Sequence, residues 1–524
     1  MKKKILYIVL GALCLLVAPA VSWNMSSATA AEAKVRAADP SGTTTGNITD
    51  VTAAKAGEPT LKELGDQTGH NKVAINIIWT LITGFLVFFM QAGFAMVETG
   101  LTRAKNASHT MAMNLFVYGL GVFGFWMCGF AIMFGGVGAL GTLGGYDGLN
   151  GEVSVNLFGH ACGLFGTKGF FLSGVYDVGV FTLFLFQVVF MDTAATIPTG
   201  AMSERWKFLS FTIYGVVVGA IIYPIFGNWV WGGGWLSQMG TNFHLGHGHV
   251  DFAGSSVVHM TGGVIALVGA WILGPRIGKY NKDRSINAMP GHNIPMAVIG
   301  AIILAFGWFG FNPGSTLAGT DLRISVVAVN TLIASVMGAI ASTLWMWIFR
   351  SKKPDPTMMV NGLLAGLVAI TAPCAFVNVQ CAGIIGLVSG VLAVEGAFFI
   401  ERVLRVDDPV GAVAVHGING AWGCLGLGLF ADGTYGDGWN GVTGTVKGLF
   451  YGDASQFTAE FIGVLTNFIV IGGISYIVFK LIGWGVGNRV SAKTEMLGLD
   501  VPEMGVEGYA GIKMDKNSET PLSR

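Results

Sequence analysis

The sequence predicts an all-α polytopic membrane protein with eleven transmembrane helices, and three observations support this class. Hydrophobic residues make up 52% of the 524 residues and charged residues only 11%, whereas a soluble domain carries about 25% charged residues. Apolar stretches of about 18 or more residues recur along the chain, which is the length that crosses a bilayer. The 79 glycines are typical of helices that pack closely within a membrane.

Residues 1–30 are predicted to be a secretory signal peptide. Three lysines after Met1 precede a short apolar run, and the Ala-Thr-Ala triplet at 28–30 is typical of a cleavage site. An uncleaved first helix is the alternative. Residues 31–72 are polar and rich in Ala, Thr and Gly, so we expect a flexible external leader without a packed core.

The eleven apolar spans make up a membrane domain at 73–484. Their predicted limits are 73–98, 109–138, 175–200, 208–227, 254–274, 294–312, 322–349, 358–374, 381–400, 409–431 and 457–484. Basic residues gather in alternate loops, and the positive-inside rule places these loops in the cytoplasm. The membrane is expected to be the inner or plasma membrane of the cell. With an external N-terminus, eleven spans place the tail at 485–524 in the cytoplasm.

The first five and the next five spans can form two inverted halves, followed by the eleventh helix. Five is an odd number, so the second half enters the membrane from the opposite side. The fifth span carries His259 in VVHMTGG, and the tenth carries His416 in AVHGING. Paired segments of this kind indicate a site between the halves, near the middle of the membrane.

The stretch DFAGSSVVH has Asp251 at one end and His259 at the other. On a helix that rises about 1.5 Å per residue, Asp251 lies near the membrane entrance and His259 about two turns inside. Ionisable groups cost much free energy in hydrocarbon and generally face a protein interior or a water-filled path. We therefore expect His259 and His416 to line one conduit for protons or for a protonatable solute.

Two facing imidazoles can share one proton, because a neutral ring has one donor and one acceptor nitrogen. Two alternatives stay open for these histidines. Each can be a core residue bonded to a backbone carbonyl, or the pair can bind a metal, although neither a third His nor a Cys lies at ligand spacing in these spans. No cofactor is predicted.

Three polar side chains inside the apolar spans need partners, because a buried polar group without a hydrogen bond is costly. Asp192 is expected to join a structural network with Thr193, Thr196 or a neighbouring helix N-terminus, with a role in the pore as the alternative. Glu98 and Gln91 in the first span are interpreted as interhelical hydrogen-bonding groups.

The outer loop before Asp251 contains aromatic and histidine clusters. In NWVWGGGW one indole can collect a small cation over its face, and an interfacial aromatic belt is the alternative. The stretch HLGHGH is interpreted as a solvated loop, with metal binding as the alternative; its histidines are His244, His247 and His249. A disulfide between Cys374 and Cys381, which flank a short outer loop, is left open.

The sequence has no Walker A loop, nucleophile elbow or zinc protease motif. Their absence argues against an ATP-driven pump, and we do not expect an enzyme. A di-histidine membrane metalloenzyme is a rival class that bound metal would distinguish. The formal net charge of zero gives no indication of nucleic-acid binding.

Across residues 73–510 the sequence resembles the ammonium transporter family, in the branch of Amt proteins and methylammonium permeases. The matching stretches are GAMSERWKF, WVWGGGWL, DFAGSSVVHMTGG, GWFGFNPGS, VNGLLAGLVAITAPCAFV, RVDDPVGAVAVHGINGAWG and GLDVPEMGVEGYAG. The Asp-x-Ala-Gly-x-x-Val-x-His signature and the Gly-Leu-Asp tail are specific together.

The resemblance implies a homotrimer that takes up ammonium or methylammonium across the lipid bilayer, with one pore in each subunit. It implies that Trp231 and Ser315 form an outer ammonium-recruiting site with Phe190 on its wall. Phe186 is then a further vestibule aromatic, and Asp251 holds the outer site together and adds negative potential behind it.

The resemblance also implies a gate formed by Phe190 and Phe311 and a pore lined by His259 and His416. Ammonium would give up its proton before ammonia passes the hydrophobic bore, with or without separate proton transfer. The runner-up functions are an ammonium sensor and a Rhesus-like gas channel on the same scaffold.

The tail is expected to be regulatory. Glu507, Gly508 and Tyr509 suit it to docking across neighbouring subunits and to answering a PII-type signalling protein at the cytoplasmic face. The chain departs from some family members in its long leader, in Gly411, where several members have an acid, and in Asp192, where some members have an apolar residue.

Overall fold

A computed structural model of the chain describes Ile48 and residues 51–509. Three parts of the chain lie outside the described residues: the predicted signal peptide, residues 31–47 and 49–50 of the leader, and residues 510–524. The chain divides into two compact units between Thr68 and Gly69. In the first unit, the amide of Thr60 donates to Glu63 (2.7 Å) and the amide of Glu63 donates to the Thr60 hydroxyl (3.3 Å), which is a capping box. Helix α2 (Leu61–Leu101) therefore begins at Leu61 rather than at 73.

The described residues contain ten helical stretches that are long and apolar enough to cross a membrane. They are Leu61–Leu101, Ala104–Phe134, Val178–Met202, Phe208–Trp231, Ser255–Leu273, Ile294–Gly314, Ile324–Arg350, Val379–Arg402, Val413–Phe430 and Ala454–Gly485. A shorter apolar helix, Pro356–Ile370, lies between the seventh and eighth of these. In chain order these segments match the eleven predicted spans, so the prediction of a helical polytopic membrane protein is confirmed.

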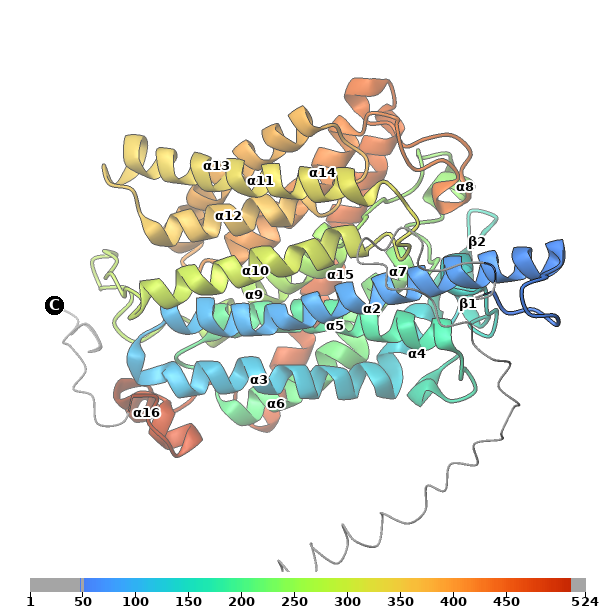
Figure 1. The fold of residues 1–524 in the computed structure, drawn as a ribbon. Coiled ribbons are helices and arrows are strands. Elements are labelled where there is room, and N and C mark those ends of the chain that lie inside the picture. Colours follow the sequence, from blue (N-terminus) through green and yellow to red (C-terminus); the bar gives the residue numbers. More distant parts are fainter. Residues whose placement is uncertain (1–47, 49–50, 510–524) are drawn as a thin grey trace, which may run out of the picture. The chain divides into compact units, whose positions relative to one another are not determined.

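Most of the long helices run along a common direction (Figure 1). The other α-helices are α3 (Ala107–Gly124), α4 (Phe130–Phe134), α5 (Val178–Met202), α6 (Phe208–Val217), α7 (Tyr223–Trp231), α8 (Met239–Phe243), α9 (Thr261–Leu273), α10 (Ile294–Gly314), α11 (Ile324–Trp345), α12 (Pro356–Ile370), α13 (Val379–Arg402), α14 (Asn419–Phe430), α15 (Ala454–Gly485) and α16 (Ala492–Leu497). Several spans contain π-helical segments, namely η3 (Phe125–Gly129), η6 (Val218–Ile222), η7 (Ser255–Met260), η8 (Met346–Arg350) and η9 (Val413–Ile418).

Polar side chains fix where several helices begin. The side chains of Asp177, Asn293, Asp355, Asn378 and Asp453 accept backbone N–H groups at the starts of α5, α10, α12, α13 and α15. Such caps satisfy amides that have no partner in the first turn of a helix.

A β-hairpin interrupts the all-helical pattern. Strands β1 (Glu152–Leu157) and β2 (His160–Gly166) pair antiparallel within the segment 139–174, where we expected a loop. The hairpin is attached to the end of α7, because the Trp229 indole donates to the Leu164 carbonyl (2.9 Å) and the Trp235 amide to the Gly163 carbonyl (3.0 Å).

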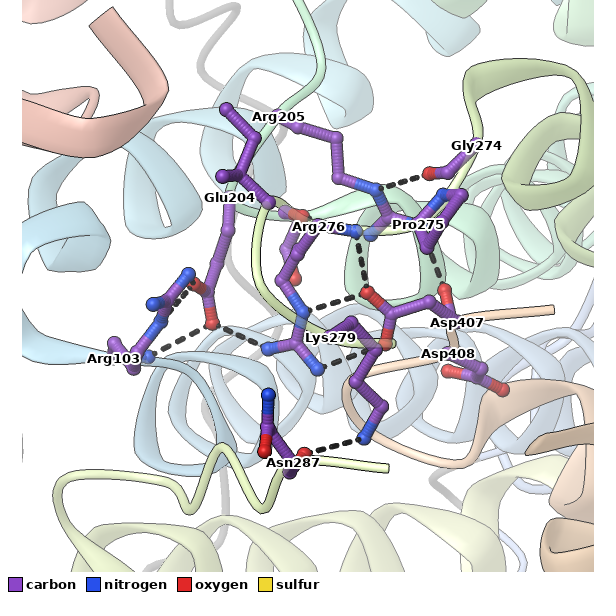
Figure 2. Close-up of polar contacts among 12 residues, drawn as sticks. Arg103, Glu204, Arg205, Gly274, Pro275, Arg276, Lys279, Asn287, Asp407 and Asp408 are labelled. Atoms are coloured by element: carbon purple, nitrogen blue, oxygen red, sulfur yellow. Dashed lines mark hydrogen bonds and ion pairs between the residues drawn. The ribbon is translucent and has the colours of Figure 1, made fainter. Parts of the chain in front are cut away.

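The loops that follow α2, α5, α9 and α13 meet in a buried ion network (Figure 2). Glu204 forms ion pairs with Arg103 and with Arg276 (2.8 Å), and Arg276 also pairs with Asp407 (2.9 Å). These four side chains are no more than 3% exposed. These four basic loops therefore share one face, as their alternation predicts; that this face is cytoplasmic stays a prediction.

The pKa values in this network reflect the balance of burial and opposite charge. Burial alone would raise the pKa of Glu204, but the guanidinium groups of Arg276 and Arg103 lower it to about 2. In the same way, burial of Asp407 is outweighed by Arg276 and Arg205, which hold its pKa well below the usual value. The network is thus ionised at neutral pH.

The segment after α15 folds against the same loops. The Val490 amide donates to the Arg205 carbonyl (3.2 Å), and the Glu495 carboxylate accepts from the Ile277 amide (2.7 Å). The π-helical segment η12 (Asp500–Met504) supplies further acceptors to the starts of α3 and α6, since Asp500 accepts from His109 (2.9 Å) and Glu503 from Phe208 (2.9 Å).

We predict that Glu204→Gln lowers the stability of the protein, because it removes one of the two buried carboxylates that balance the guanidinium groups of Arg103 and Arg276. Breaking a buried ion pair from one side costs about 3–5 kcal/mol. The folded-state pKa of Glu204 is about 2, below its ordinary value of 4.5, so its contribution is present above pH 4.5 and is lost as the pH falls toward 2.

The measurement is the apparent unfolding temperature in detergent at several pH values. The gap between wild type and Glu204→Gln should be largest near neutral pH and should shrink below pH 4.5. Glu395→Gln, which removes the more exposed pair with Arg350, is the control and should change the temperature little. Equal effects of the two variants would contradict the prediction.

Candidate functional site

Asp251 caps the span that carries His259. Its two carboxylate oxygens accept the backbone N–H groups of Gly254 (2.7 Å), Ser255 (2.9 Å), Ser256 (2.7 Å) and Val257 (3.0 Å). The chain turns into the helix at Gly254, whose φ of 117° favours glycine. A carboxylate at a helix N-terminus also interacts favourably with the helix dipole, so Asp251 fixes the start of η7 and the position of His259 within it.

Asp408 starts the span that carries His416 in the same way. It accepts the N–H groups of Val410 (3.3 Å), Gly411 (3.0 Å) and Val413 (2.8 Å), and Gly411 has a φ of 80°. Burial raises the pKa of Asp408 in spite of these bonds. Both histidines lie eight positions after the capping Asp, and both glycines lie three positions after it. This shared spacing accords with two repeated halves, and it gives Gly411 a structural reason.

The two histidine-bearing spans cross in direct contact. A Cβ atom on Gly263 would lie 2.2 Å from the Gly417 nitrogen, so the α9 backbone touches η9 at this point. The crossing brings the two imidazoles together, with 3.3 Å between the Nδ1 atoms of His259 and His416. Their ring planes differ by 26°. His259 is fully buried and His416 is 5% exposed.

Aromatic rings continue the row on the side of His259. Phe311 lies 5.3 Å from His259 between ring centroids, and it stacks on Phe190 at 4.0 Å. Phe190 in turn contacts Phe186 (4.6 Å) and Trp231 (6.1 Å). The residues expected to form a gate and a pore therefore lie in one continuous row.

A cavity of about 150 Å³ lies at the end of this row that Phe186 and Trp231 form. Its lining residues are Phe134, Val137, Leu140, Leu183, Phe186, Gln187, Phe190, Trp231, Phe252, Ser315, Leu317 and Trp439. The Trp231 indole N–H donates to the Asp251 carbonyl (2.6 Å), and the Ser315 hydroxyl donates to the Phe311 carbonyl (2.8 Å). Trp231 thus keeps its ring face, and Ser315 its oxygen lone pairs, for a molecule in the cavity.

Eight of the twelve residues that line this cavity were not predicted from the sequence, and Phe252, Trp439 and Gln187 are among them. Phe252 and Trp439 come from loops, and nothing in the sequence pairs them. Gln187 has a buried side-chain oxygen without a hydrogen-bond partner among the described residues. A glutamine in the apolar run FLFQVVF was the available signal for a polar group that faces a cavity.

A second, smaller cavity of about 20 Å³ lies on the other side of the histidines. Its lining residues are Phe94, Val97, Glu98, Ile197, Leu304, Asn361, Leu364, Val410, Ala412, Val415 and His416. The Phe94 ring is 6.1 Å from the His416 ring. The described row thus runs from one cavity through aromatic rings and imidazoles to another cavity.

The model of the Ammonium Transporter Family matches residues 78–509. The chain belongs to this family. It is 43% identical to ammonium transporter Amt2 of Archaeoglobus fulgidus, over 89% of this chain and 93% of that one. It is 34% identical to ammonium transporter Amt1 of Haloferax mediterranei, over 84% of this chain and 81% of that one.

Solved structures agree with this placement. The chain is similar to a "Sensor Amt Protein" with a TM-score of 0.72 and 34% identity, over 83% of this chain and 99% of that one. It is also similar to Candida albicans Mep2, with a TM-score of 0.68 and 25% identity, over 82% of this chain and 90% of that one.

The interhelical bonds expected of Glu98 and Gln91 are present in this family member. The Asn114 amide donates to Glu98 Oε2 (2.7 Å), and the Gln91 amide donates to the Thr196 hydroxyl (3.1 Å). They tie α2 to α3 and α5.

The network expected around Asp192 is not formed by its neighbouring threonines. Thr193 donates to the Val189 carbonyl and Thr196 to Asn114, while Asp192 Oδ1 is buried without a hydrogen-bond partner among the described residues. The five described cysteines are free, so Cys374 and Cys381 form no disulfide.

The interpretation of HLGHGH as a solvated loop is wrong for two of its histidines. His244 is exposed, but His247 is 5% exposed and His249 is fully buried. The reason is a partner far along the chain, since His249 Nδ1 lies 2.7 Å from a Glu460 oxygen on α15. Burial alone would lower the pKa of His249, but the adjacent carboxylate raises it.

The hydrogen bonds around His249 assign its ring protons. The Ser256 hydroxyl donates to Asp251 Oδ2 (2.7 Å), so His249 Nε2 is the donor in its 2.9 Å contact with that hydroxyl. His249, Asp251 and Cys424 lie close enough together for a metal, but the ion pair with Glu460 takes up His249 Nδ1, and hydrogen bonds occupy His249 Nε2 and both Asp251 oxygens. The chain Glu460–His249–Ser256–Asp251 is therefore a structural support behind Trp231.

We predict that His249→Asn lowers the apparent unfolding temperature in detergent by several degrees, because it leaves a Glu460 oxygen buried without its partner. Removing one member of a buried charged pair costs about 3–5 kcal/mol. His244→Asn in the same loop is the matched control, since Asn tolerates the positive φ of 58° at His244. A variant at 249 as stable as the variant at 244 would refute the structural role.

Proposed function

We propose that the chain conducts ammonium across a membrane as a transporter or channel, and that it is not an enzyme. Family membership supports ammonium as the substrate. The observation that carries the proposal is the row in which stacked Phe190 and Phe311 (4.0 Å) lead to His259 and His416 in contact. A row of this kind suits a solute that is a cation at one end and neutral in the middle.

The outer cavity is the proposed recruiting site. The Trp231 face attracts a cation, which is worth about 0.5–2 kcal/mol, and the Ser315 oxygen accepts one N–H. We add Gln187 to this site, because its unpartnered oxygen can accept another N–H. Asp251 holds Trp231 through its backbone carbonyl and places a negative charge behind it.

Phe190 and Phe311 are the proposed gate. Between their rings ammonium loses hydration, and desolvation disfavours the charged form of an amine. Ammonium can avoid this desolvation cost by giving up a proton, whereas a potassium ion cannot. The gate therefore selects for a cation that can be deprotonated.

His259 and His416 are the proposed lining for ammonia. When both rings are neutral, one Nδ1 donates to the other, so the two Nε2 positions are one donor and one acceptor. Ammonia has both N–H groups and a lone pair, so it matches either ring. Two rings this close titrate as a pair.

We further propose the assembly and orientation that the family resemblance implies. The protein is a homotrimer in the inner or plasma membrane, with its signal peptide at 1–30 removed, the leader 31–72 outside and the tail 485–524 inside. A PII-type signalling protein is the proposed partner of the tail, whose described part at 485–509 lies beside the loops that carry Arg205 and Ile277.

A sensor is the second candidate function, favoured by the similarity to a structure named "Sensor Amt Protein". A sensor would bind ammonium with little flux. Proteoliposomes that contain the purified protein should take up labelled methylammonium, and ammonium but not potassium should compete. Ammonium binding without uptake would favour the sensor.

We predict that His259→Ala weakens the selectivity for ammonium over potassium by about tenfold or more, which corresponds to about 1.4 kcal/mol. The small side chain opens space for a hydrated ion and removes an imidazole. The measurement is ammonium and potassium current in the same proteoliposomes. The exposed His160→Ala is the control, and unchanged selectivity in the His259 variant would show that the imidazole role is wrong.

A further inference from the structure

The cavity beyond His416 contains a carboxyl group that the proposed mechanism does not use. Among its eleven lining residues, Glu98 is the one with a carboxyl group, and His416 is the other that can titrate. Phe94 and Glu98 lie one turn apart on α2, and Phe94 contacts the His416 ring. Glu98 is therefore the next ionisable group along the row after the histidines.

Glu98 is held so that one of its oxygens stays available. Asn114 donates to Oε2 (2.7 Å), and the Thr199 hydroxyl, which also bonds the Thr196 carbonyl (2.5 Å), contacts the same oxygen. These contacts leave Oε1 as the oxygen that can meet a molecule in the cavity. Across the cavity, the Asn361 amide nitrogen donates to the Val410 carbonyl (3.1 Å). This bond fixes Asn361 by its donor end and leaves its carbonyl oxygen as an acceptor.

The cavity fits a molecule of the size of water. Its volume is about 20 Å³, and one water needs about 10–15 Å³ on this measure. Ammonium is close to water in size and carries only N–H donors, so oxygen acceptors bind it, most strongly where one of them is charged. We propose that Glu98 and Asn361 form a second ammonium-binding site, on the opposite side of the histidines from Phe190 and Phe311.

This inference rests on the proposed function. Ammonia that leaves His416 takes the proton of the buried Glu98 carboxyl: the O–H bond breaks, a new N–H bond forms on the ammonia lone pair, and the carboxylate that is left is the counter-charge of the ammonium ion. When ammonium leaves for the aqueous phase, hydronium returns a proton to Glu98 and becomes water. The other titratable groups near Glu98 are His416 on η9, Asp408, whose carboxylate accepts N–H groups at the start of η9, and Tyr214 on α6, whose hydroxyl donates to the Ala195 carbonyl (3.0 Å).

The test compares transport from the two faces of the membrane. Right-side-out and inside-out vesicles from the same expressing cells are given labelled methylammonium over a range of concentrations. For Glu98→Gln the apparent KM from the face near Glu98 should rise about tenfold, and the KM from the face of the outer cavity should stay within about twofold. Gln has the shape of Glu and keeps an acceptor for Asn114 and Thr199.

Two further variants keep the inference falsifiable. Asn361→Ala removes the second oxygen and should raise the same KM about threefold, so it decides the matter if Glu98→Gln does not accumulate. Asp192→Asn is the matched control, a buried carboxyl in α5 outside the cavity lining, and should behave as wild type.

The outcomes separate the two proposals. If Glu98→Gln and Asn361→Ala shift the KM equally from both faces, or do not shift it, the second ammonium-binding site is overturned while the proposed function stands. Absence of transport by the wild-type protein from either face overturns both.

Discussion

The close crossing of two helices at Gly263 and Gly417 is the constraint on which the rest of the site depends. With 2.2 Å between an added Cβ on Gly263 and the Gly417 nitrogen, any side chain at 263 would push the spans apart. Their approach sets the 3.3 Å contact of the histidines. Phe311 packs on one of these rings and Phe94 on the other, so the whole row follows from this crossing.

The capping carboxylates control the register of that crossing. Asp251 and Asp408 each fix the first amides of a span, and a helix that began one residue later would turn its histidine by about 100°. Asp251 has a second role, because its carbonyl accepts the Trp231 indole N–H. One residue thus connects the outer cavity to the start of the histidine-bearing span, and Glu460 supports it through His249 and Ser256.

The spans could be predicted from the sequence because long apolar runs are a local property, and their limits differ by at most about five residues except at Leu61. The paired histidines were predictable from their matching surroundings, and the spacing of Asp408, Gly411 and His416 was available as a further signal. The burial of His249 was not predictable, because its partner Glu460 lies on the last span. Likewise, Glu98 reads as an interhelical group, and only the fold shows that it also lines a cavity. The hairpin at 152–166 follows a Gly-rich segment, and its short alternation of polar and apolar residues is only a weak local signal.

In the proposed mechanism, the distribution of oxygen atoms along the row is the reason that a proton and ammonia part. Both cavities offer oxygen acceptors, which are Ser315 and Gln187 in one cavity and Glu98 and Asn361 in the other. The part of the row between the two cavities consists of Phe190, Phe311 and the two imidazoles, and it contains no carboxylate. A cation needs hydrogen-bond acceptors on all sides. Between the two cavities, the row offers only one acceptor nitrogen when both imidazoles are neutral. The charged form is therefore favoured at the two ends and the neutral form between them. On this view, selectivity arises from the order of polarity along the path rather than from one tight binding site.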